Sequence, residues 1–222
     1  MDENLKKEQE KTLGTEVMRP NFILRIAVVA FDILYGKKRT LPKFRVLEIL
    51  ARYPYTAWEN GAYHVVTSAF CSSVSGEKKD KVEYVLRHIA MGRKAQDNEQ
   101  WHLVLLDEQI KNLGIKQGFF RHKIIPPLLT FGYYWLTRFM YRVRPSWSFH
   151  MNAAFESHAE HEYMKMAKEN PDWENMKIQS EYFNYYPECQ SLSDLIRRIG
   201  LDEREHMEES LEECRRLANS GS

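Results

Sequence analysis

The sequence has no uninterrupted run of eighteen apolar residues, no Cys-x-x-Cys pair and no marked excess of one charge. The first absence argues against a membrane-spanning helix, which needs about 20 apolar residues. The second predicts that Cys71, Cys189 and Cys214 are free thiols in a reducing compartment. A net charge of +1 gives no reason to expect a nucleic-acid partner.

Glycine and proline are also scarce, and long stretches contain neither, which predicts an all-α fold. We expect one domain over residues 20–217, with a flexible, solvated tail at 1–19 and a short tail at 218–222. The charged N-terminus resembles neither a signal peptide nor a transit peptide, as expected for a prokaryotic protein or a trimmed mature chain. Pro54 should bend the second helix, and Pro126–Pro127 should interrupt or kink the fourth. The expected helical segments are 20–36, 41–72, 80–112, 118–142, 146–169 and 191–217.

Two of these segments carry the pattern Glu-x-x-His, at Glu99–His102 and at Glu203–His206. Residues three apart share one face of a helix, so each pair can reach a single point. One such pair usually marks a solvated face. Two pairs, each preceded at a similar distance by a glutamate in an apolar helix, favour a dimetal site in a four-helix bundle. Iron is the expected metal, with manganese as the alternative.

The two further carboxylates are less certain from the pattern alone. Glu156 is the leading candidate on the fifth helix, with Glu160 and Glu162 as competitors. On the second helix, Glu48 and Glu59 lie eleven residues apart and share a face, so periodicity does not separate them. The similar spacing of the two halves weakly prefers Glu48.

At this point the residues resemble a known family. The segments around Glu48, Glu99, Glu156 and Glu203 are similar, in the same order, to the four ligand motifs of the alternative oxidase superfamily, and closest to its plastid terminal oxidase branch. The match covers roughly residues 20–215. It implies a ferritin-like four-helix bundle with a di-iron core and two amphipathic helices on a membrane surface.

The resemblance also implies roles for individual residues. It selects Glu48 over Glu59 and implies that the four glutamates hold two iron ions, with His102 and His206 beside them. Tyr163 matches the candidate redox-active tyrosine of the family, and Tyr141 matches another tyrosine near the site. Asn98 and Asp202 flank the ligands and are expected to orient the histidines.

The substrate implied by the resemblance is a quinol, with Lys43, Leu47 and Ala51 as pocket residues. Two departures concern this region. Lys43 stands where the family often has an arginine, which keeps the charge but loses the bidentate fork. Gly200 stands where the family has an arginine before the last ligand, with Arg197 and Arg198 upstream.

The uncharged segment 124–137 lies between arginines and lysines. It suits a helix in the headgroup region of one leaflet, with segment 20–36 beside it, although two buried core helices would share this composition. The resemblance favours attachment to a thylakoid, plastid or bacterial inner membrane, on its stromal or cytoplasmic face, and a homodimer.

The predicted activity is oxidation of two molecules of plastoquinol or ubiquinol coupled to reduction of O₂ to water, without proton pumping. A di-iron hydroxylase of a quinone or lipid, and a ferritin-like iron-binding protein, are the alternatives.

Overall fold

The computed structural model describes residues 2–71 and 76–220 and confirms the all-helical prediction. In this part of the chain, the regular structure outside the helices is a single isolated bridge between Lys177 and Ser191. The helices in chain order are α1 (Glu3–Leu13), α2 (Phe22–Tyr35), α3 (Leu41–Cys71), α4 (Gly76–Asn112), the π-helical turn η1 (Phe120–Ile124), α5 (Ile125–Val143), α6 (Pro145–Glu169), the 3₁₀ turns η2 (Pro171–Glu174) and η3 (Glu181–Asn184), and α7 (Leu192–Ser220).

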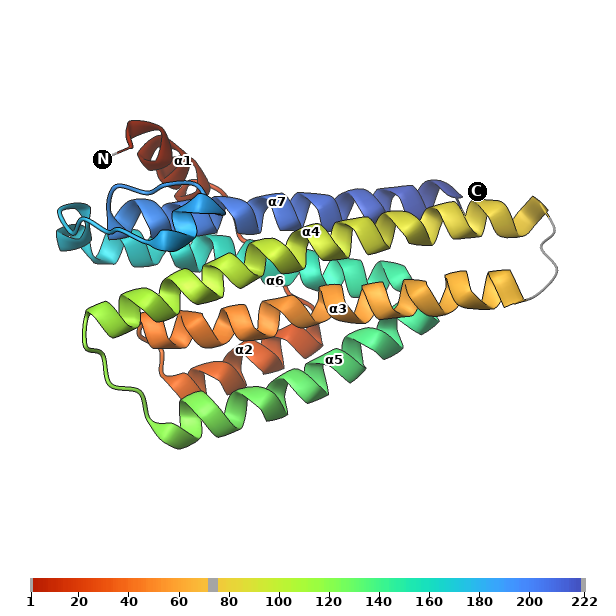
Figure 1. Cartoon of the computed structure of the whole chain (residues 1–222), viewed down its shortest axis with the longest axis horizontal. Helices are drawn as coiled ribbons and strands as arrows, with labels where there is room; N and C mark the ends of the chain where they lie inside the picture. The colour runs from red at the N-terminus through yellow and green to blue at the C-terminus, as the bar shows by residue number, and fades with distance from the viewer. Residues whose placement is uncertain (1, 72–75, 221–222) are drawn as a thin grey trace.

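Helices α3, α4, α6 and α7 form the bundle (Figure 1), in which α3 packs along α4 and α6 packs along α7. Apolar side chains from all four helices close its interior, and each fully buried one contributes about 1.5–3 kcal/mol. The largest core cluster includes Phe44, Leu105, Leu106, Tyr163, Leu195 and Ile199. This arrangement is the predicted four-helix bundle, and it brings the middles of four long helices together.

Helices α2 and α5 lie along one side of the bundle, next to α3 (Figure 1). Gly36 ends α2 with a φ of +85°, a conformation that glycine adopts without strain. The two prolines at 126 and 127 do not interrupt α5 but stand in its first turn, where a missing N–H costs little. Helix α3 continues through Pro54. No helix in the described residues has both the length and the apolarity needed to cross a bilayer.

The N-terminal segment differs from the expected solvated tail. Residues 3–13 form α1, which packs on α6 and α7 with Leu5, Gln9 and Thr12 buried. The Gln9 side chain donates to the Met164 carbonyl at 2.7 Å and accepts from Arg197 Nε at 2.9 Å. These contacts join segments that are far apart in the sequence. The charged composition of residues 3–13 therefore gave no sign that one face of this helix is buried.

Other boundaries shift by a few residues. Helix α7 extends to Ser220, beyond the predicted boundary at 217, and residues 221–222 lie outside the described residues. Ser191 caps α7, since its hydroxyl accepts from the Asp194 N–H at 3.1 Å. Cys189 and Cys214 are free thiols, and the side chain of Cys71 lies outside the described part.

Candidate metal centre

Each helix of the bundle contributes one buried glutamate to a common region. Glu48 on α3, Glu99 on α4, Glu156 on α6 and Glu203 on α7 are each at most 1% exposed. One helical turn beyond two of them, His102 and His206 are also buried. The structure therefore brings together all six residues that the sequence motifs predicted as metal ligands.

The six side chains form two overlapping sets whose ligand atoms lie within 4.8 Å of one another. One set adds Glu48 and His102 to Glu99 and Glu203; the other adds Glu156 and His206 to the same two glutamates. Because Glu99 and Glu203 belong to both sets, they lie where they can bridge two cations. The arrangement has the internal symmetry that the sequence repeat suggested.

The competing glutamates lie elsewhere. Glu59 accepts hydrogen bonds from Arg93 and Gln96 at 2.9 and 2.8 Å, near the surface. Glu160 accepts from Arg204 at 2.8 Å, and Glu162 pairs with Arg39 at 2.9 Å. These three carboxylates already have cationic partners.

The central carboxylates, by contrast, are poorly satisfied by the protein. Both oxygens of Glu99, both oxygens of Glu203 and one oxygen of Glu156 are buried and accept no hydrogen bond. His206 Nδ1, 3.0 Å from Glu99 Oε1, also lacks a properly aligned partner. Leaving such groups buried and unpaired costs roughly 1–3 kcal/mol each. Carboxylate oxygens and imidazole nitrogens in this number fit two hard or borderline divalent cations such as iron or manganese.

The electrostatics of the protein groups agree with that fit. Burial raises the pKa of Glu48 and Glu156 well above the usual range, and the neighbouring carboxylates raise it further. Burial alone would lower the pKa of His206, but contacts with Glu203 and Glu99 outweigh it and raise the value to about 10. The cluster thus holds protons to limit carboxylate repulsion, and divalent cations would replace those protons.

Two tyrosines hydrogen-bond to glutamates of the opposite ligand set. The Tyr163 hydroxyl, on α6, donates to Glu48 on α3. The Tyr55 hydroxyl, on α3, donates to Glu156 Oε1 on α6 at 2.9 Å. Each tyrosine lies seven residues after the glutamate of its own helix. Only Tyr163 was predicted from the sequence, although Tyr55 has the same spacing of two turns from its own glutamate.

A second group of side chains orients His102. Its Nε2 lies 3.0 Å from Asp202, which also accepts from Asn98 at 3.2 Å and from Tyr186 at 2.7 Å. Arg198, one turn before Asp202, donates to its other oxygen at 2.7 Å. Burial opposes ionisation of Asp202, yet contact with His102 holds its pKa at about 2. Asp202 therefore contacts His102 directly and Asn98 contacts Asp202, whereas Tyr186 comes from an irregular segment and had no sequence signal.

Gly200 has a packing reason. A side chain there would begin 3.1 Å from both Tyr163 Cβ and Met164 Cε, because α7 approaches α6 closely at this point. The arginine that the family has at this position is therefore absent, and Arg198 contacts Asp202 from one turn earlier in α7.

Tyr141 lies apart from the carboxylates. Its hydroxyl is 2.6 Å from His88 Nδ1, and its ring packs in a separate cluster with Trp58 and Phe149. The structure thus does not bring Tyr141 into contact with the predicted metal ligands.

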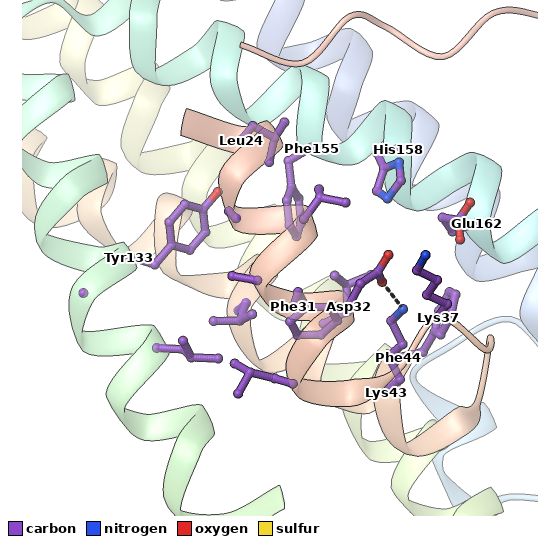
Figure 2. Close-up of a pocket in the computed structure, with 18 of the residues that line it drawn as sticks. Leu24, Phe31, Asp32, Lys37, Lys43, Phe44, Tyr133, Phe155, His158 and Glu162 are labelled. Carbon is purple, nitrogen blue, oxygen red and sulfur yellow. Dashed lines mark hydrogen bonds and ion pairs between the residues drawn. The ribbon is translucent and has the colours of Figure 1, made fainter. Parts of the chain in front are cut away.

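A cavity of about 600 Å³ opens between α2, α3, α5 and α6 (Figure 2). Lys43 and Leu47 line it, whereas Ala51 does not. Lys43 Nζ donates to Asp32 at 2.6 Å, the pair drawn at the polar end of the cavity in Figure 2, and to the Gly36 carbonyl at 2.8 Å. The rest of the lining is largely apolar and comes from α2, α3, α5 and α6, and its other polar members are Lys37, Arg39, His158 and Glu162.

The cavity is adjacent to the metal centre through the packing of one ring. Phe44 lines the cavity and packs edge-on against Tyr163, with ring centroids 4.6 Å apart. Tyr163 in turn donates to Glu48, the neighbour of Leu47 in the chain. A molecule in the cavity would therefore lie within a few side chains of the carboxylate cluster.

The outer faces of α2 and α5 expose large apolar side chains. Those more than half exposed are Phe22, Ile26, Val29, Ile33, Leu128, Phe131, Trp135, Phe139 and Val143. Arg121, Lys123, Arg138, Arg142 and Arg144 lie in or next to the same segment. Exposed apolar side chains in this number, with cations in or next to the same segment, mark an interaction site rather than ordinary solvent-facing helices.

Replacing Glu156 by glutamine is expected to stabilise the metal-free protein. The amide removes one of four crowded carboxyl groups and can still accept the Tyr55 hydrogen bond, so a gain of about 1–3 kcal/mol follows from removing a group that must take up a proton when it is buried. Thermal unfolding in chelator measures this gain, and the added stability that wild type gains from Fe²⁺ or Mn²⁺ should be reduced in the variant. Glu160→Gln, one turn along α6, should instead destabilise because it breaks the Arg204 pair. A lower melting temperature for Glu156→Gln would contradict the electrostatic description.

Comparisons with known proteins agree with this geometry. A family model described as alternative oxidase matches residues 3–214. The chain is 26% identical, over 228 aligned positions, to ubiquinol oxidase 4, chloroplastic/chromoplastic, of Arabidopsis thaliana. The alignment covers 93% of this chain and 58% of that protein, so the chain spans a little over half the length of this relative. No solved structure matches the chain significantly.

Proposed function

This chain belongs to the alternative oxidase family, and from that premise we propose that it is a membrane-surface quinol oxidase. It oxidises two quinols, reduces one O₂ to water and pumps no protons. The observation that carries the proposal is the set of four buried carboxylates and two imidazoles, one carboxylate from each bundle helix, with oxygens that the protein leaves unpaired. The similarity to a ubiquinol oxidase supports the choice of substrate.

In this proposal the cluster would hold two iron ions. Their ligands would be Glu99 and Glu203, which belong to both sets, together with Glu48 and His102 from one set and Glu156 and His206 from the other. When bound, the iron supplies the redox chemistry with O₂ that amino-acid side chains lack. Asp202 fixes the ring of His102 through Nε2, so that Nδ1 faces the cluster, and Tyr163 and Tyr55 hold Glu48 and Glu156 in place. The buried position of the cluster keeps bulk water and soluble reductants away from the metal site.

The quinol enters the cavity between α2 and α5 and lies with its ring towards Leu47 and Phe44. The Lys43 ammonium has three donors, of which Asp32 and Gly36 use two, so one remains for a quinol oxygen. The Asp32 carboxylate beside it can accept a proton as the quinol is oxidised. The apolar lining suits the ring and the first part of an isoprenoid chain.

The exposed apolar faces of α2 and α5 would rest in one leaflet of the membrane, with the neighbouring arginines and lysines at the headgroups. This placement opens the cavity towards lipid, where a long-chain quinol is dissolved. A plastid or bacterial membrane is the expected location, and a homodimer formed through the same region is part of the proposal.

Oxygen uptake by the purified, iron-loaded protein tests the proposal. Addition of plastoquinol or ubiquinol in vesicles should start uptake, with one O₂ consumed for two quinols. With ¹⁸O₂ the label should appear in water. Label in the quinone or lipid would instead identify a hydroxylase, and iron binding without quinol-dependent uptake would favour an iron-binding protein.

A further inference from the structure

A buried hydrogen-bonded row of three side chains lies outside the carboxylate cluster. The Tyr141 hydroxyl is 2.6 Å from His88 Nδ1, and His88 Nε2 is 3.2 Å from Glu213 Oε2. The row joins α5, α4 and α7, and its members are at most 8% exposed. Neither the metal centre nor the quinol cavity uses it.

The two ring nitrogens of His88 have different partners. Nε2 faces the Glu213 carboxylate, an acceptor, and contact with His88 outweighs burial and keeps the pKa of Glu213 below its usual range. Nδ1 faces the Tyr141 hydroxyl, which can donate its hydrogen. With Nε2 donating to Glu213, Nδ1 is the nitrogen placed to take the Tyr141 proton.

Aromatic rings connect this row to the metal centre. Tyr55, whose hydroxyl donates to Glu156, packs edge-on against Trp58 at 5.1 Å between centroids. Trp58 packs on Phe149 at 4.5 Å, and Phe149 on Tyr141 at 6.0 Å. Tyrosine and tryptophan are the most readily oxidised aromatic side chains. The Phe149 ring packs against both Trp58 and Tyr141, so the three rings form a contiguous path.

We propose that Tyr141, with His88 as its proton acceptor, is a one-electron redox site that takes oxidising equivalents away from the metal centre through Trp58 when no quinol is bound. One electron leaves the phenol ring of Tyr141 for the oxidised metal centre, and the hydroxyl proton moves to His88 Nδ1. The products are a neutral phenoxyl radical and an imidazolium beside the Glu213 carboxylate. Quinol later gives one electron to the phenoxyl radical, and the same proton returns from His88 to restore the phenol. The quinol loses one proton to Asp32 and becomes a semiquinone, which the metal centre oxidises to the quinone.

The position of Tyr141 explains why this residue, rather than Tyr55, would be the one that is oxidised. Tyr55 also has an acceptor in Glu156, but that group lies within the metal centre, where an unpaired electron next to O₂ chemistry invites damage. Tyr141 is separated from the cluster by the three rings of Tyr55, Trp58 and Phe149, and it lies on α5, the helix that borders the quinol cavity. The site would protect the buried core while keeping the equivalent available to substrate.

Electron paramagnetic resonance tests this inference, which rests on the proposed function for its oxidant. Reduced, iron-loaded protein is mixed with O₂ without quinol and frozen at short times. Wild type should show an organic radical whose spectrum narrows when tyrosine is ring-deuterated. Tyr141→Phe and Trp58→Phe should each lose it, the second without altering the hydrogen-bonded row. Tyr134→Phe, two turns away on α5 with no histidine partner, should keep it.

A second readout is chemical damage. Peptide mass spectrometry after repeated oxygen exposure should find more oxidised Trp58 in Tyr141→Phe than in wild type. If the iron is oxidised normally and the radical persists in Tyr141→Phe, the inference is overturned while the quinol oxidase proposal stands. If O₂ does not react at all, the proposed function is wrong, and the redox site is then tested with hydrogen peroxide as the oxidant. A radical at Tyr141 after peroxide treatment would support the redox site, and the absence of this radical would contradict it.

Discussion

Replacing Glu203 by alanine is expected to abolish quinol-dependent oxygen uptake and to remove bound iron. Glu203 belongs to both ligand sets, so its loss removes a carboxylate from each cation at once. Even partners outside the ligand set commonly change metal affinity or activity by roughly 10–100-fold, so losing a shared ligand should exceed about 100-fold. Oxygen-electrode rates and iron content per chain by mass spectrometry measure the two effects.

The matched control for this variant is Glu208→Ala. Glu208 lies on the same helix and faces solvent, so its removal should leave both rate and iron content unchanged. Circular dichroism checks that both variants fold. A folded Glu203→Ala protein that keeps two irons per chain and the parental rate would show that the buried carboxylates are not the metal centre.

The double substitution of Phe131 and Phe139 by serine is expected to release the protein from membranes. The two side chains are 68% and 65% exposed on α5, eight residues apart, and neither lines the cavity. Burying a phenylalanine side chain in an apolar phase contributes about 1.5–3 kcal/mol. Losing two therefore weakens partitioning by about 3–6 kcal/mol, or roughly 10²- to 10⁴-fold. Co-sedimentation with vesicles containing anionic lipid measures the change.

Substrate choice separates membrane binding from catalysis in this variant. Oxidation of a short-chain, water-soluble quinol should continue, while oxidation of a long-chain quinol in vesicles should fall. Tyr185→Ser is the control, since this 70% exposed ring stacks on Trp101, far in the chain from α2 and α5. Unchanged sedimentation of the double variant would indicate that the apolar surface serves another purpose, such as packing against a second copy.

Several features of the site were predictable because they depend on the local repeat of a helix. Glutamate and histidine three residues apart share a face, so the pairs at Glu99 and Glu203 could be read directly. The choice between Glu48 and Glu59 could not be made in this way, since three full turns separate them. The structure separates them by their neighbours, because Arg93 and Gln96 satisfy Glu59 whereas Glu48 meets other carboxylates.

The sequence alone determined the helical class, the approximate helix limits, the two ligand pairs and the apolar segments that α2 and α5 expose. Only the tertiary structure decided which groups meet across helices: Tyr55 with Glu156, Tyr141 with His88, and α1 with the bundle. The physical reason is the distance along the sequence over which each interaction acts. Helical periodicity is set by hydrogen bonds four residues apart, whereas contacts between helices depend on packing shifts of an ångström or two that no local pattern encodes.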